Sequence, residues 1–287
     1  MLGRYILLAM IPAWVWLGLL AVAAVFGLAT VLVVATDSSG SAASADFRYQ
    51  CDSALGPDEH STTETGVNTG TTETIRPSDI PTTNPFAELT IAPDDSEVSG
   101  WERDCVTAMR SAPYQLPALR VTNAGAAVDC ARQVALAQVG QSMAAATLVK
   151  NVIYQASAVW TTGRCGLLGA APGDPTASAG RAGAEPAPAA AGCGRAAQNP
   201  GTDVSSVVVL PDTVAAQGLC GQRVEADQVS AGDLVFWDYR SHAPTRVGIA
   251  VGPAAVVTAD PISGGVLETG MPSGDGVRVK RVLGSGS

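Results

Sequence analysis

The sequence has few histidines and few basic residues, and each shortage excludes a class of function. Only His60 and His242 occur in 287 residues, so we expect no histidine-based metal site, and no cysteines have zinc-ligand spacing. Lys and Arg together number 17 against 26 Asp and Glu, for a net charge of −9. Binding the phosphates of a nucleic acid requires a basic face. The sequence therefore predicts no cofactor, no metal and no nucleic acid partner.

Long apolar runs are also scarce, and the most prominent one lies at the start of the chain. It extends from Tyr5 to Ala35, which exceeds the ~20 residues that cross the hydrocarbon core of a bilayer. Arg4 before this run and Asp37 after it favour a cytoplasmic N-terminus with the rest of the chain outside. We therefore expect an anchor over residues 1–36 in a bacterial-type cell membrane. A signal peptide cleaved at Ala43–Ala45 is the alternative.

Cysteine is absent from the first 50 residues, and all six cysteines follow the apolar run. An even number of cysteines in an exported chain predicts up to three disulfides, with buried thiols as the alternative. The cysteines are Cys51, Cys105, Cys130, Cys165, Cys193 and Cys220.

Two segments have the composition of non-core sequence. Residues 37–98 are acidic and rich in Thr and Pro, with too few apolar residues to offset the entropy of ordering, so we expect a flexible stalk. Residues 164–203 are an Ala/Gly/Pro low-complexity stretch bracketed by Cys165 and Cys193. We interpret this stretch as a surface insertion closed by a disulfide between those two cysteines, or else as an interdomain linker. The folded domain is then residues 99–287.

Within this domain the pattern changes from helical to strand-like. Apolar periodicity predicts helices over 101–110, 124–139 with Asn123 as N-cap, and 144–158. Short β-rich runs separated by Gly, Pro and Asp follow, which predicts a small antiparallel sheet and an α+β fold. The runs are Val204–Leu210, Asp233–Tyr239, Arg246–Val251, Ala255–Ala259, Val266–Met271 and Val277–Leu283.

Four motifs in this domain occur in the order found in one family. They are ARQVALAQVG (131–140), LPDT (210–213), AGDLVFW (231–237) and VGIAVG (247–252). In this arrangement the chain resembles the NlpC family, papain-like cysteine peptidases that cut peptidoglycan stem peptides. The resemblance implies a papain-like domain in which a helix carries the nucleophile and two strands carry the base and the residue that orients it.

The residues at the family's catalytic positions are unsuited to the chemistry. The base position, directly before Val-Gly-Ile, is Arg246, whose guanidinium stays protonated and accepts no proton. The orienting position falls on Thr258. The nucleophile position is Ala145 if 144–158 is the catalytic helix. It is Cys165, with His242 as a rearranged base, under a second alignment that lacks the helix expected after the nucleophile.

The sequence therefore favours a membrane-anchored, extracytoplasmic pseudoenzyme with a degenerate NlpC-type domain. It would bind peptidoglycan, or scaffold or regulate a cell-wall hydrolase or envelope complex, without cleaving anything. The alternatives are an active stem-peptide endopeptidase that uses Cys165 and His242, and a structural component of an envelope assembly.

Overall fold

The computed structural model describes residues 43–58, 81, 83–166 and 207–284. The chain divides into two compact units. Of the first unit, residues 1–49 with 67–73, only the helical residues 43–49 are described. The second unit, residues 50–66 with 74–287, contains every element discussed below. No helix among the described residues is long and apolar enough to span a membrane, and the anchor predicted over 1–36 lies outside them.

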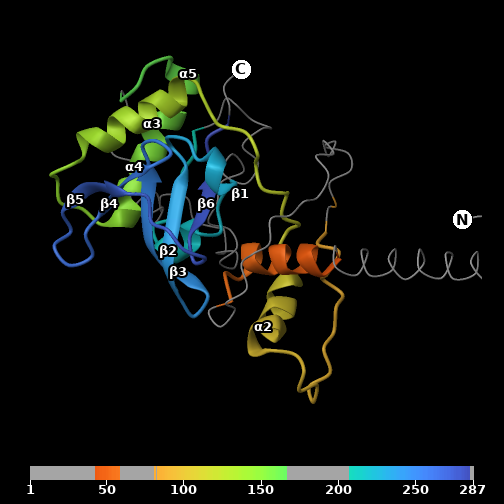
Figure 1. Cartoon of the computed structure of the whole chain (residues 1–287). Coiled ribbons are helices and arrows are strands. Elements are labelled where there is room, and N and C mark those ends of the chain that lie inside the picture. Colours follow the sequence, from red (N-terminus) through yellow and green to blue (C-terminus); the bar gives the residue numbers. More distant parts are fainter. Residues whose placement is uncertain (1–42, 59–80, 82, 167–206, 285–287) are drawn as a thin grey trace, which may run out of the picture. The chain divides into compact units, whose positions relative to one another are not determined.

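A six-stranded antiparallel sheet forms the centre of the second unit (Figure 1). Its strand order is β1-β6-β2-β3-β4-β5, so β6 pairs with both β1 and β2. The strands are β1 (Gln222–Arg223), β2 (Leu234–Arg240), β3 (Ala243–Ala250), β4 (Ala255–Ala259), β5 (Val266–Gly270) and β6 (Arg278–Arg281). With most helices preceding this sheet in the chain, the α+β class expected from the sequence is confirmed.

The helices begin and end close to the predicted positions. They are α2 (Gly100–Met109), α3 (Ala126–Ala137), α4 (Ala145–Ser157), α5 (Val159–Thr162) and α7 (Val214–Gln217), with a 3-10 turn at Ala226–Gln228. A capping box starts α2, where the Ser99 hydroxyl accepts from the Glu102 amide and the Glu102 carboxylate accepts from the Ser99 amide.

Asn123 was expected to cap α3, and this prediction is wrong. The N-cap is Gly125, whose φ of 114° suits glycine. The Asn123 side chain instead donates to the Leu283 carbonyl at 2.9 Å and accepts from the Ala124 amide. It therefore ties the start of the helical half to the end of the chain.

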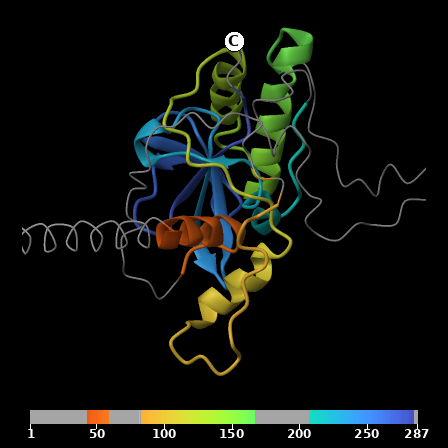
Figure 2. The ribbon, with the colours of Figure 1, turned by 90° about the vertical axis from the view of Figure 1, so that its right-hand side faces the viewer.

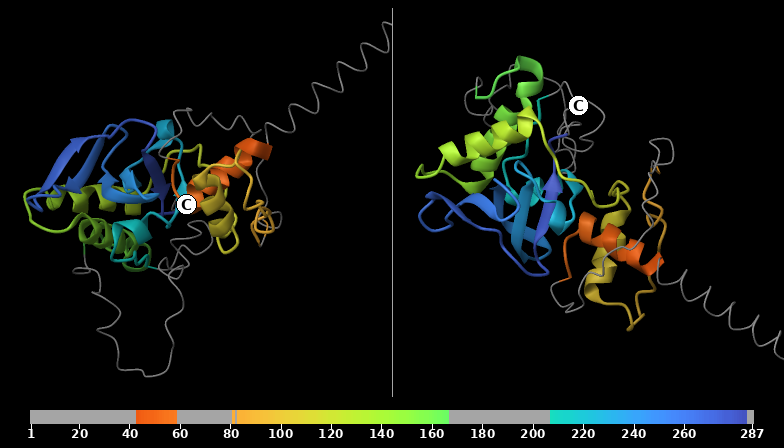
Figure 3. Two further views of the ribbon diagram at one scale, coloured as in Figure 1. Left: turned by 90° about the horizontal axis from the view of Figure 1, so that it is seen from below. Right: turned by 45° about the horizontal axis from the view of Figure 1, so that its top comes forward.

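Helices α3 and α4 cover one face of the sheet, as the two views in Figure 3 and the turned view in Figure 2 show. The alternation of side chains in β2 places Leu234 and Phe236 in the core beneath these helices. Val235 points to the other face, where it joins a smaller apolar cluster with Ala250 and Val279. The main hydrophobic core thus lies between α3, α4 and the sheet.

The strand predicted over Val204–Leu210 is wrong for its described part. Residues 207–210 are extended but pair with no strand. The Val208 amide donates to the Ser157 hydroxyl of α4 at 2.8 Å, and the Val208 and Leu210 side chains are buried in the main core. The apolar pattern reflects packing against α4, which a run of alternating residues satisfies without a strand partner.

The described part of the predicted stalk, 37–98, is folded, which corrects that prediction. Its residues 50–54, which belong to the second unit, are helical. Cys51 forms a disulfide with Cys105 of α2, and the Gln50 side chain exchanges two hydrogen bonds with the backbone of Gln115. A covalent link and buried polar contacts stabilise this segment, although its composition offers few apolar side chains. Residues 59–80 and 82 lie outside the described part.

The disulfide predicted between Cys165 and Cys193 is also wrong. Cys165 pairs with Cys130 of α3, with Cα atoms 5.4 Å apart. The insertion predicted at 164–203 lies outside the described residues from 167 onward.

Candidate functional site

Arg246, at the position of the family's general base, lies on β3 directly opposite Trp237 on β2. Its guanidinium carbon lies 5.5 Å from the centre of the Trp237 ring, within the range of a cation–π interaction. A guanidinium has five donors and no acceptor, so it cannot take a proton from a nucleophile. The contact with Trp237 gives Arg246 a packing role in place of an acid–base role.

Thr258, at the orienting position, lies on β4 beside β3. Thr258 is 2% exposed, and its hydroxyl donates a hydrogen bond to the Val247 carbonyl at 2.7 Å. Opposite it in the ladder is Gly248, where an added Cβ would meet Val256 Cγ2 at 2.5 Å. The hydroxyl of Thr258 is therefore engaged by backbone in a tightly packed part of the sheet.

Ala145 is the first residue of α4, a helix that packs against β3 and β4. The residue two positions earlier, Met143, donates its amide to the Gly264 carbonyl in the β4–β5 turn. Arg246 lies two residues before Gly248, which pairs with Thr258 of β4. Arg246 and Thr258 therefore lie on adjacent strands, whereas Ala145 begins a helix that packs against the main core, and none of the three carries a nucleophile or a base.

The alternative pair, Cys165 and His242, is not brought together. The Cys165 sulfur is bonded to Cys130, so it offers no thiolate. His242 lies in the β2–β3 turn with φ 65°, and its Nδ1 is 3.5 Å from the Pro57 carbonyl oxygen. Figure 1 shows α5, which Cys165 follows, and the β2–β3 turn at opposite ends of the sheet. The disulfide gives Cys165 a structural role, because it joins the residues after α5 to α3.

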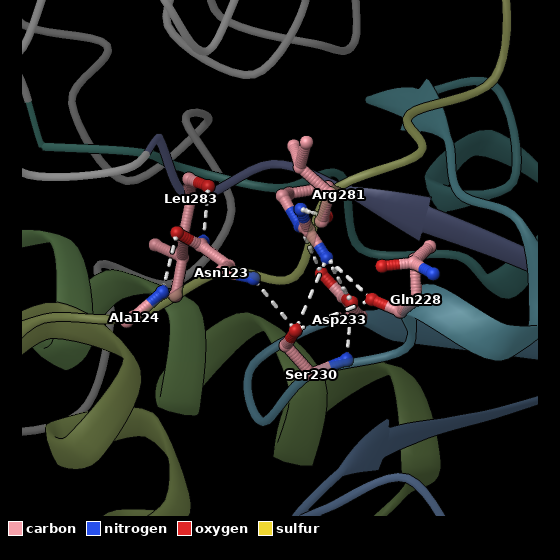
Figure 4. Close-up of polar contacts among 8 residues, drawn as sticks. Asn123, Ala124, Gln228, Ser230, Asp233, Arg281 and Leu283 are labelled. Carbon is pink, nitrogen blue, oxygen red and sulfur yellow. Dashed lines mark hydrogen bonds and ion pairs between the residues drawn. The ribbon is translucent and has the colours of Figure 1, made fainter.

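Asp233, from the Gly-Asp-Leu motif, has a structural role. It is 1% exposed and forms a bidentate ion pair with Arg281, with Nε–Oδ1 at 2.7 Å and Nη2–Oδ2 at 2.8 Å (Figure 4). Burial raises the pKa of Asp233, and the hydrogen bonds from Arg281 and the Ser230 amide offset only part of that effect. Arg281 also donates to the Val121 and Gln228 carbonyls. This network joins β2, β6 and the loops beside them.

A second site, missed by the sequence analysis, surrounds Asp52. Its carboxylate is buried between two arginines, with Arg223 Nη1 at 2.8 Å and Arg278 Nε at 2.9 Å. Burial raises the pKa of Asp52, but the charges and hydrogen bonds of Arg223 and Arg278 outweigh it and hold the pKa below its ordinary value. A cavity of about 340 Å³ lies beside this ion-pair cluster.

Lys280 on β6 lines the same cavity and is 3% exposed. Burial lowers the pKa of Lys280 to about 7, helped by the positive charges of Arg223 and Arg278 and opposed by Asp52. Arg223, Arg278 and Lys280 project from one sheet face, because Arg223 pairs with Lys280 and the two β6 residues are two positions apart. The cavity wall is therefore a basic patch with a single carboxylate.

The sequence contained only part of the information needed to find this second site. Basic residues at 278 and 280 alternate with valines, as expected for a strand with one polar face. Asp52, however, is 171 residues from Arg223 and 226 residues from Arg278. No local pattern indicates a pairing over such separations.

Neither site holds a cluster of residues suited to a metal ion. Among the described residues, no group of three or more His, Cys, Asp or Glu side chains could hold one. No family model, no curated protein and no solved structure matches this chain.

Proposed function

We propose that this chain is an exported, non-catalytic relative of the NlpC family that binds peptidoglycan at the cell envelope. The observation that carries the proposal is which residues occupy the three positions where the NlpC family keeps its catalytic side chains. Arg246 stacks on Trp237 at the base position, the Thr258 hydroxyl is bonded to backbone at the orienting position, and Ala145 begins α4 at the nucleophile position. A peptidase of this type needs a thiolate and an imidazole at these positions.

An oxidising compartment is supported by the cysteines. Cys51–Cys105 and Cys130–Cys165 are disulfides, Cys220 is also disulfide-bonded, and none of the described cysteines is free. Such bonds persist mainly in exported proteins. Together with the apolar run over 5–35, they favour a protein anchored in the membrane with its folded domain outside.

Peptidoglycan binding is tested with the full chain in detergent micelles and purified insoluble peptidoglycan. We expect the protein to sediment with the polymer, while mass spectrometry of the soluble fraction detects no new stem-peptide ends. New ends would show that the protein is a peptidase. If the chain stays in solution and instead co-purifies with a membrane complex, peptidoglycan is not its ligand and the domain is a scaffold.

The sedimentation assay has a matched pair of variants. Arg246→Gln and Arg240→Gln each remove one guanidinium from the β2–β3 hairpin, but only Arg246 stacks on a ring, and Arg240 is 75% exposed. If the family's substrate cleft is the binding surface, Arg246→Gln weakens sedimentation and Arg240→Gln leaves it unchanged. Equal behaviour of the two variants would mean that binding occurs elsewhere on the domain.

A further inference from the structure

The cavity beside β6 contains two buried polar groups that the described chain leaves without a partner. The Lys280 side chain has no hydrogen bond or ion pair with any described residue, although it is 3% exposed. The Ser53 hydroxyl, which lines the same cavity, likewise has no hydrogen-bond partner there. Buried polar groups in native proteins are nearly always hydrogen-bonded. Two donors on residues that line one cavity therefore indicate a ligand that accepts hydrogen bonds.

The charged side chains that line the cavity also indicate a ligand that accepts hydrogen bonds. The cavity is lined by three cationic side chains, Arg223, Arg278 and Lys280, and by one carboxylate, Asp52. Asp52 already pairs with both arginines, so three positive charges minus one negative charge leave an excess of two when Lys280 is protonated. A buried charge requires a partner. A negatively charged ligand would supply it.

Lys280 differs from the other lysine of the chain in having no ion-pair partner among the described residues. The chain contains two lysines, Lys150 and Lys280, and both are buried. Lys150 forms an ion pair with Asp212 at 2.5 Å, which explains its position within the domain. Lys280 has no such partner among the described residues, so the cavity is the evident place for its counter-charge.

The other residues that line the cavity restrict the chemical class of the anion. Small and branched apolar side chains form much of the lining, so an inorganic ion would leave that surface uncovered. Tyr239, Thr213 and His242 add hydrogen-bonding groups around it. This mixture suits amide groups and short side chains better than a hydrocarbon tail. The apolar residues are Leu55, Ala215, Ala216, Leu219 and Pro244.

We propose that this cavity binds the C-terminal carboxylate of a short peptide with small apolar side chains. The carboxylate accepts hydrogen bonds from the Lys280 ammonium and the Ser53 hydroxyl, and Arg223 and Arg278 add electrostatic attraction. At about 340 Å³, the cavity is near the lower end of the size range of small-molecule sites. The inference goes beyond the proposed function, because it concerns a soluble ligand in a cavity that Ala145, Arg246 and Thr258 do not line.

The test uses acetyl-Ala-Ala and its C-terminal amide, which differ only in the charge and hydrogen-bonding of one end. Calorimetry with the full chain at pH 6.5 should give binding of the acid that is at least tenfold tighter than binding of the amide. Lysine labelled with ¹³C at Cε gives two signals, one per lysine, and the Lys280 signal should shift only with the acid.

Three variants separate a binding role from a structural one. Lys280→Met, which keeps the length and apolar stem of the side chain, should weaken acid binding at least tenfold, and Ser53→Ala should weaken it severalfold. Lys150→Met alters the other buried lysine and should retain binding. Circular dichroism of each variant checks that it is folded. Ser53→Ala keeps the proposal testable if Lys280→Met does not fold.

Several results would overturn the proposal. Equal affinity for the acid and the amide would exclude carboxylate recognition. Tighter binding of hexanoate than of acetyl-Ala-Ala would make the site a fatty-acid pocket, and equal binding of propionate would remove the role of the peptide. Because sedimentation with insoluble peptidoglycan is measured separately, failure of one assay leaves the other result standing.

Discussion

At the scale of single residues, burial changes the acid–base behaviour of groups around the cavity. It lowers the pKa of Lys280 to about 7 and raises the pKa of Tyr239, because each loses hydration of its charged form. Asp52 responds in the opposite direction to most buried carboxyls, since Arg223 and Arg278 outweigh its desolvation. The cavity therefore holds one strongly ionised carboxylate beside a lysine that changes charge near neutral pH.

Lys280 should make stability depend on pH. An unfolded lysine keeps its proton up to about pH 10.4, whereas the folded side chain loses it near pH 7. Between these values the unfolded chain binds one more proton, so the free energy of unfolding increases as pH rises, by up to about 1.4 kcal/mol per pH unit. Urea unfolding from pH 7.5 to 9.5 measures this slope, and Lys280→Met should flatten it. A wild-type slope equal to that of the variant would contradict the low pKa.

Asp52→Asn should be strongly destabilising. The change removes the carboxylate that forms ion pairs with both Arg223 and Arg278, and breaking a buried ion pair typically costs about 3–5 kcal/mol. Asp238→Asn is the matched control, because Asp238 pairs with Arg240 at 3.7 Å on the surface, and we expect a change below about 1 kcal/mol. Chemical denaturation of both variants makes the comparison. Similar losses in the two would show that the buried cluster is not a main source of stability.

At the scale of secondary-structure elements, local patterns predicted the helices and most strands. The periodic apolar residues of 124–139 and 144–158 became α3 and α4, whose buried faces form the main core. The β-rich run over Asp233–Tyr239 predicted the two ends of β2 to within one residue each. The strand predicted over 207–210 is wrong, because this extended apolar segment packs against α4 and pairs with no other strand. Periodicity identifies a buried face and does not identify what covers it.

The candidate sites were predictable to different degrees for the same reason. Ala145, Arg246 and Thr258 follow from motifs whose spacing is local, and Arg246 and Thr258 lie on adjacent strands. The cavity depends on Asp52, which lies in a polar segment and reaches its partners across more than half of the chain. Long-range pairing of this kind is fixed by the tertiary fold, so composition alone assigned the segment to a stalk.

The β3–β4 pair offers a test of element packing. A Cβ added at Gly248 would meet Val256 Cγ2 at 2.5 Å and the Val257 carbonyl oxygen at 3.0 Å, whereas nothing lies within 4 Å of one added at Gly252. Gly248→Ala should therefore lower the free energy of unfolding by about 1–3 kcal/mol. Gly252→Ala, at the end of the same hairpin, should be nearly neutral. Denaturant titration of the two single variants measures both changes in the free energy of unfolding. A neutral Gly248→Ala would argue against the described register of β3 and β4.

At the scale of the whole molecule, the second unit depends on covalent links between distant segments. Cys51–Cys105 joins the segment containing Asp52 to α2, and Cys130–Cys165 joins α3 to the residues after α5. The two bonds close loops of different length, with sequence separations of 54 and 35 residues. Only the first lies next to the cavity, because Cys51 precedes Asp52 directly. The two bonds can therefore be distinguished by what their removal does to Lys280.

Replacing Cys51 and Cys105 together by alanine should lower the free energy of unfolding by about 4 kcal/mol, and replacing Cys130 and Cys165 by slightly less, because the stabilisation grows slowly with loop length. The two variants should also differ in the pKa of Lys280. Loss of the first disulfide frees the segment that covers Lys280, so its pKa should rise from about 7 towards the ordinary lysine value as hydration returns. The second variant should keep the low pKa. Titration of the ¹³Cε-lysine signal in both variants measures this difference. An unchanged Lys280 pKa without the Cys51–Cys105 bond would mean that the ion pairs of Asp52 alone hold the segment in place.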